Sequence, residues 1–132
     1  MLNDAGAARK PVACVENPGS LFDLMSRADL AISGGGQALY ELACVGCPAI
    51  AVEVAPDQGG QMQVLQEDGL IRAAGKAGDP GLLPKIQEDL QRLAGDPHLR
   101  SDMARKGQER VDGKGADRVA QQFIEQTEAL AR

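Results

Sequence analysis

The pattern of apolar and polar positions predicts short strands that alternate with helices. The strand candidates are Val12–Val15, Leu30–Ile32, Ala49–Val54 and Leu70–Arg72. Helical spacing of apolar residues follows each of the first three, over residues 20–28, 37–45 and about 60–68. Strands that alternate with helices form parallel sheets with right-handed crossovers. We therefore predict an α/β fold with a doubly wound, parallel, Rossmann-like sheet.

The remainder of the chain has a purely helical pattern. One helix carries Leu83, Ile86, Leu90 and Leu93, and the segment Gly95-Asp96-Pro97 separates it from the next helix. A last helix begins at about Ala116, and its spacing predicts burial of Val119, Phe123, Ile124 and Leu130. The 132 residues suffice for one domain, residues 1–132. Because the first strand has no strand–helix unit before it, we expect a C-terminal piece, either a fragment or a natural subunit.

A glycine-rich turn, Ser33-Gly34-Gly35-Gly36, follows the second strand candidate. Ligands of open parallel sheets bind at the carboxyl ends of the strands, where such turns lie. Glycine lets the backbone approach a ligand, and the free N–H groups that begin the next helix favour an anion. A tight turn that needs small residues is an equally open interpretation. Neither dinucleotide nor P-loop spacing is present.

Gln37 and Glu41 share one face of the helix that follows this turn, because they are four residues apart. The buried stripe of that helix lies on its other face, so the Glu41 carboxylate is expected to be free. A carboxylate at a fixed position can accept hydrogen bonds from both hydroxyls of a ribose. A solvated glutamate near a helix N-terminus is the alternative.

Composition narrows the ligand class. The net charge is −5, and the chain has no Trp and three aromatic residues, Phe22, Tyr40 and Phe123. These features argue against a nucleic-acid partner. No apolar run or leader pattern indicates a membrane span or a signal peptide, and an odd number of cysteines favours reduced thiols. We therefore expect a cytoplasmic protein.

The stretch from Arg27 to Ile50 resembles the C-terminal domain of GT-B nucleotide-sugar enzymes. It carries Ala28-Asp29-Leu30-Ala31-Ile32-Ser33, a glycine turn, then Glu41 and Gly46-Cys47-Pro48, with Asp57-Gln58 after the next strand. The resembled enzymes include the lipid II N-acetylglucosaminyltransferase and the UDP-sugar hydrolase of the pseudaminic acid pathway. The tail Val111–Val119 is similar to the hydrolase branch and its spore-coat polysaccharide relatives.

The resemblance implies a role for nine residues. Glu41 would bind the UDP ribose, and Ser33, Gly34, Gly35, Gly36 and Gln37 would hold the diphosphate. Asp57, Gln58 and Gln61 would face the sugar. Two departures affect this last group, since Gly59-Gly60 replaces bulkier polar residues and Gln61 stands where an Asn is common.

The chemistry implied by the resemblance is incomplete in this chain. No Asp-x-Asp motif is present to hold a divalent cation, so we expect metal-independent chemistry without a cofactor. The general base of the resembled families belongs to an N-terminal acceptor domain, and the single histidine, His98, has no reactive neighbours in sequence. Cys44 and Cys47 are interpreted as small buried residues and not as a redox or zinc pair.

Three functional classes are therefore weighed. The first is the UDP-sugar-binding part of an inverting glycosyltransferase, inactive when isolated. The second is a nucleotide-sugar hydrolase of the pseudaminic-acid or spore-coat type. The third is a non-catalytic binding subunit that docks onto a separate acceptor-domain protein. An isolated half would expose an apolar cleft wall, which favours self-association.

Overall fold

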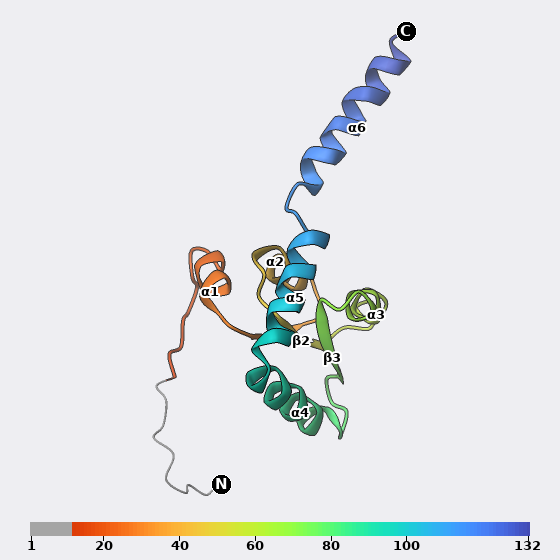
Figure 1. The fold of residues 1–132 in the computed structure, drawn as a ribbon. Coiled ribbons are helices and arrows are strands. Elements are labelled where there is room, and N and C mark those ends of the chain that lie inside the picture. The colour runs from red at the N-terminus through yellow and green to blue at the C-terminus, as the bar shows by residue number, and fades with distance from the viewer. Residues whose placement is uncertain (1–11) are drawn as a thin grey trace, which may run out of the picture.

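A computed structural model describes residues 12–132 (Figure 1). Its elements are α1 (Phe22–Arg27), β1 (Ala31–Gly34), α2 (Ala38–Val45), β2 (Ala49–Glu53), α3 (Gly59–Glu67), β3 (Ile71–Lys76), α4 (Leu82–Gly95), α5 (Pro97–Arg110) and α6 (Gly115–Leu130). The three strands form one parallel sheet in the order β1-β2-β3. The predicted α/β class with a parallel, Rossmann-like sheet is confirmed.

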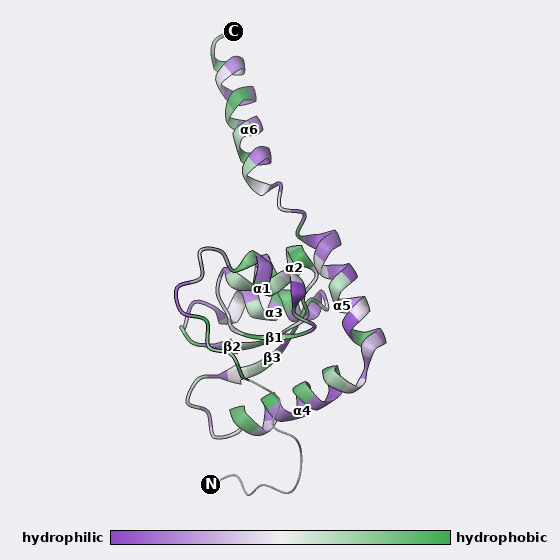
Figure 2. Cartoon of the chain, turned by 90° about the vertical axis from the view of Figure 1, so that its left-hand side faces the viewer, coloured by the Kyte–Doolittle hydropathy of each residue, from purple (hydrophilic) through white to green (hydrophobic). Residues whose placement is uncertain are grey.

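Helices cover both faces of this sheet, as Figure 2 shows with α2 and α3 on one side of the strands and α4 on the other. The side of α2 and α3 is packed around Leu39, Leu42 and Leu65, while Ile50 and Leu93 anchor the side of α4 and α5. Ala49, Ile50 and Ala51 of β2 are all buried, because the central strand is covered on both faces. The chain is thus a three-layer unit whose strands all end at one edge.

Helix α5 packs closely against α2. A Cβ added to Gly107 would lie 2.8 Å from the Ala43 carbonyl oxygen, so only glycine allows the two helices this approach. Helix α2 itself ends where Gly46 adopts a left-handed conformation with φ of 77°, as the sequence predicts for a helix stop. These contacts fix α2, the helix that follows the glycine turn.

Two sequence expectations are wrong in the structure, and one buried charged residue was not foreseen. Val12–Val15 forms no strand and is exposed, so the described residues hold three strands and not four. In α4, Leu83 and Leu90 are exposed, and Asp89 is buried on the face that contacts β3. The predicted burial of Val119, Phe123, Ile124 and Leu130 also fails, because each side chain is more than half exposed on α6.

The reason for the last error is visible in the arrangement of α6. The helix projects away from the sheet and its flanking helices (Figure 1). An amphipathic pattern reports that a helix has an apolar face, but it does not report what covers that face. None of the helices in residues 12–132 is long and apolar enough to cross a lipid bilayer.

Candidate functional site

The glycine turn lies at the carboxyl end of β1, as predicted. The strand ends at Gly34, and α2 begins at Ala38. Ser33 Oγ donates to the Gly34 carbonyl at 3.1 Å, and the Gly35 N–H donates to the Val52 carbonyl at 2.8 Å. The loop therefore stays attached to β2 after β1 has ended.

Three N–H groups follow this attachment point without an acceptor. Leu39 N–H donates to the Gly36 carbonyl at 3.1 Å, and Tyr40 N–H donates to the Gln37 carbonyl at 3.0 Å. Within residues 12–132, no hydrogen bond uses the N–H of Gly36, Gln37 or Ala38. Unpaired N–H groups at the start of a helix attract anions through both hydrogen bonding and the helix dipole.

Packing explains the absence of a side chain at Gly35. A Cβ at this position would overlap the Met62 sulfur and lie 3.1 Å from Gln58 Oε1. A Cβ at Gly36 would meet only an ordinary contact, 3.5 Å from Gln58 Nε2. The tight-turn interpretation, which the sequence left open, therefore applies to Gly35, where only a small residue fits. The same packing does not exclude a ligand beside Gly36.

The loop between β2 and α3 lies directly against the glycine turn. Gln58 Oε1 accepts hydrogen bonds from the N–H groups of Val54 at 3.0 Å and Ala55 at 3.3 Å. Gln61 Nε2 donates to the Gly35 carbonyl. The two strand-end loops lie at the same sheet edge because β1 and β2 are parallel. Sequence reasoning named both glutamines, but it did not foresee that their amides bond to the backbone.

Glu41 lies in the first turn of α2 with an exposed side chain. It lines a cavity of about 380 Å³ whose other wall is the segment Pro18–Phe22 together with Met25 and Val45. It also lines a cavity of about 300 Å³ with Gln37 and Tyr40. The predicted shared face of Gln37 and Glu41 is confirmed, because both side chains reach the same hollow.

The segment Pro18–Phe22 is a wall that sequence reasoning missed. The turn signal Asn17-Pro18-Gly19 was present in the sequence, but nothing local indicated that this turn faces Glu41. Asp57 lies in the β2–α3 loop with an exposed side chain and forms no ion pair within the described residues. The structure therefore brings the glycine turn, Gln58 and Gln61 into contact, and it leaves Asp57 free at the same edge.

The remaining chemical candidates have ordinary environments. His98 is exposed in the first turn of α5. Burial, together with the nearby charge of Asp29, raises the pKa of the Cys47 thiol. A raised pKa keeps this thiol protonated and unreactive, as expected for a small buried residue.

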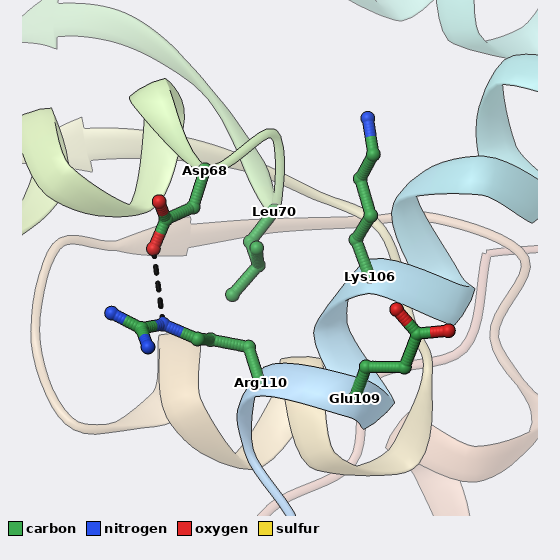
Figure 3. A pocket seen from close by; sticks show the side chains of 5 residues that line it. All are labelled: Asp68, Leu70, Lys106, Glu109 and Arg110. Carbon is green, nitrogen blue, oxygen red and sulfur yellow. Dashed lines mark hydrogen bonds and ion pairs between the residues drawn. The ribbon is translucent and has the colours of Figure 1, made fainter.

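A separate hollow of about 360 Å³ lies between the end of α3 and α5 (Figure 3). Asp68, Leu70, Lys106, Glu109 and Arg110 line it. Each charged group has a partner of opposite sign: Arg110 Nε pairs with Asp68 Oδ2 at 3.1 Å, Lys106 with Asp102 at 2.7 Å, and Glu109 with Arg105 at 2.9 Å. Because its charges are already compensated and it holds none of the nine predicted residues, this hollow is not a candidate site.

The sequence of this chain is similar to that of a bacterial protein. The chain is similar to the spore coat polysaccharide biosynthesis protein SpsG of Bacillus subtilis (strain 168), with 31% identity over 107 residues. The match covers 80% of this chain and 31% of that protein, so the chain spans about a third of the relative's length. No protein-family model and no solved structure matches the chain.

Proposed function

We propose that this chain binds a nucleotide-sugar as the donor-binding part of a glycosyl-transfer enzyme of polysaccharide biosynthesis. The observation that carries the proposal is the set of three unpaired N–H groups at Gly36, Gln37 and Ala38, one helical turn from the Glu41 carboxylate. Similarity to a protein of spore coat polysaccharide biosynthesis supports the same class of chemistry.

The proposed ligand is a nucleoside diphosphate sugar, with UDP as its nucleotide. The diphosphate would accept hydrogen bonds from the three N–H groups, which suits an anion held without a cluster of basic side chains. Glu41 would accept hydrogen bonds from the ribose hydroxyls. The hollow between Glu41 and Pro18–Phe22, about 380 Å³ in volume, has a size suited to a nucleoside.

Transfer of the sugar requires stabilisation of the departing diphosphate and a base that activates the acceptor. The N–H groups of the glycine turn would stabilise the leaving group without a metal. We propose that the base and the acceptor site belong to a preceding domain or a separate subunit. On this proposal the 132-residue chain binds the donor but turns it over very slowly.

Hydrolysis of the nucleotide-sugar, with water as the acceptor, is a second candidate. The observation that favours it is the segment Val111–Val119, which resembles the hydrolase branch and its spore-coat polysaccharide relatives. The similar protein is itself named for spore coat polysaccharide biosynthesis. Transferase and hydrolase share the donor site, so they differ in the acceptor. Release of the free sugar from UDP-sugar by a longer form of the protein, in the absence of any acceptor, would distinguish hydrolysis from transfer.

Calorimetric titration with UDP tests the proposal. Substitution of Glu41 by Ala should weaken UDP binding by about 1–3 kcal/mol, the cost of losing charged hydrogen bonds to hydroxyls. Glu88→Ala is the matched control, since Glu88 is an exposed glutamate of α4 on the opposite face of the sheet. A folded protein that fails to bind millimolar UDP would exclude the proposed donor site. Parent-like binding by Glu41→Ala would exclude the ribose assignment alone.

A further inference from the structure

Gln58 and Gln61 are joined to the glycine turn by contacts that determine what each amide can do. Gln61 Nε2 donates to the Gly35 carbonyl across 26 positions of sequence. Gln58 Oε1 accepts two backbone N–H groups of the β2–α3 loop, those of Val54 and Ala55. We call this pair of residues the glutamine clamp.

The polarity of the Gln58 amide follows from these bonds. Two N–H donors can face only the amide oxygen, so the NH₂ group must point the other way. That group lies beside Gly36, at 3.5 Å from where a Cβ would stand. Within residues 12–132, no hydrogen bond uses the Nε2 hydrogens of Gln58. The clamp therefore presents a donor, and not an acceptor, to the glycine turn.

Both polar groups of Gly35 are fixed by the surrounding structure. Its N–H donates to Val52 of β2, and its carbonyl accepts from Gln61 of α3. Met62 packs where a Gly35 side chain would be. A peptide held on three sides cannot rotate freely, so Val52, Gln61 and Met62 together set the direction of the N–H groups that follow it.

We infer that Gln61 is a positioning residue that holds the anion-binding turn for a diphosphate, and that the free Nε2 group of Gln58 beside Gly36 donates to the same diphosphate, so that neither glutamine acts by contacting the sugar. The inference rests on the proposed function for the identity of the ligand. It differs from the family-based expectation, which assigns both glutamines to the sugar.

The binding test compares four probes with each variant: UDP, uridine, inorganic pyrophosphate and UDP-N-acetylglucosamine. Gln61→Ala and Gln58→Ala should weaken UDP and pyrophosphate about tenfold, the effect of about 1.4 kcal/mol, and leave uridine binding unchanged. Gln63→Ala is the matched control, because Gln63 is an exposed glutamine of α3 that bonds only to Glu67. It should bind all four probes like the parent.

Two other outcomes would overturn the inference. Weaker binding of UDP-N-acetylglucosamine with unchanged UDP and pyrophosphate would make the glutamines sugar contacts. Equal weakening of all four probes, with a lower melting temperature, would indicate a purely structural role. If the parent binds pyrophosphate but not uridine or UDP, the proposed nucleotide function fails, and weaker pyrophosphate binding by Gln61→Ala and Gln58→Ala would still support the role of the clamp.

Amide chemical shifts give a measurement that needs no ligand. In ¹H–¹⁵N spectra, Gln61→Ala should displace the Gly35, Gly36 and Gln37 resonances and leave those of β3 in place. Gln63→Ala should leave all of them unchanged. Parent-like shifts for the glycine turn in Gln61→Ala would show that the clamp does not hold it.

Discussion

Asp89 forms the most deeply buried ionic contact in the part of the chain that the structure describes. Its side chain is 1% exposed on α4, and its Oδ1 accepts from Arg72 Nη2 at 3.0 Å and from Lys85 Nζ at 3.2 Å. The side chains of Arg72 and Lys85 are 30% and 34% exposed. Asp89 Oδ2 has no hydrogen-bond partner. The free-energy cost of removing a charge from water therefore falls mainly on the Asp89 carboxylate, because both cations remain partly exposed to solvent.

This difference in burial predicts which substitution lowers the free energy of unfolding more. Arg72→Met keeps an apolar stem but leaves the buried carboxylate with Lys85 alone. Breaking a buried pair in this way should lower the free energy of unfolding by about 3 kcal/mol. Asp89→Leu removes the buried charge together with its unpaired oxygen, and both cations can turn to water. The loss should then be about 1 kcal/mol.

Urea unfolding at pH 7, followed by circular dichroism, measures both losses. For a protein of this size, 3 kcal/mol moves the midpoint by roughly 2 M. Glu109→Gln, which breaks the exposed pair with Arg105, is the control and should cost less than about 0.5 kcal/mol. If Asp89→Leu destabilises as much as Arg72→Met, the reasoning from burial is wrong.

Four further predictions concern packing, the two thiols and α6. Gly107→Ala should lower the free energy of unfolding by about 1–3 kcal/mol, because its methyl group would press on the Ala43 carbonyl of α2; an unchanged urea midpoint would contradict the close packing. Alkylation followed by mass spectrometry should label exposed Cys14 rapidly and buried Cys47 only after unfolding. Folding raises the pKa of the Cys47 thiol. The contribution of this thiol to the free energy of unfolding is therefore present below the pKa of the unfolded thiol and is lost as pH rises through the pKa of the folded one. Cys47→Ala should remove that part of the pH dependence of stability. Deletion of α6, none of whose residues is buried, should change the urea midpoint negligibly, and a large loss would mean that α6 packs on the body of the molecule in solution.

Local sequence signals located several elements well. The glycine at position 46 ends α2 in a left-handed conformation, and Pro97 begins α5 after an Asp96 cap whose side chain accepts the Leu99 N–H. Strand β2 was evident from the alternation of Ile50, Val52 and Val54 with smaller or polar residues. In each case the cause acts within a few residues along the chain, so the sequence states it directly.

The position of the glycine turn was also predictable from the sequence, since it follows a buried strand, and the spacing of Gln37 and Glu41 indicated one shared helix face. That the turn binds an anion stays a prediction, because the sequence left a tight turn as an equally open interpretation. The assignment of UDP to this site came from the resemblance and stays a prediction. The spacing within the turn could not show that Gly35 is constrained by Met62, since that contact joins two separate elements.

The sequence by itself determined the class of fold, the order of most elements and the presence of a glycine turn at the end of a strand, because these depend on periodicity and on backbone preferences of nearby residues. Only the tertiary structure decided which polar side chains are buried and which apolar ones are exposed. Asp89 is buried because Arg72, 17 positions away, lies on the adjacent strand, whereas Phe123 is exposed because α6 leaves the body of the molecule. Likewise, Gln61 reaches Gly35 only after the sheet has aligned the two loops. Such contacts depend on how distant segments meet, which no local pattern of residues specifies.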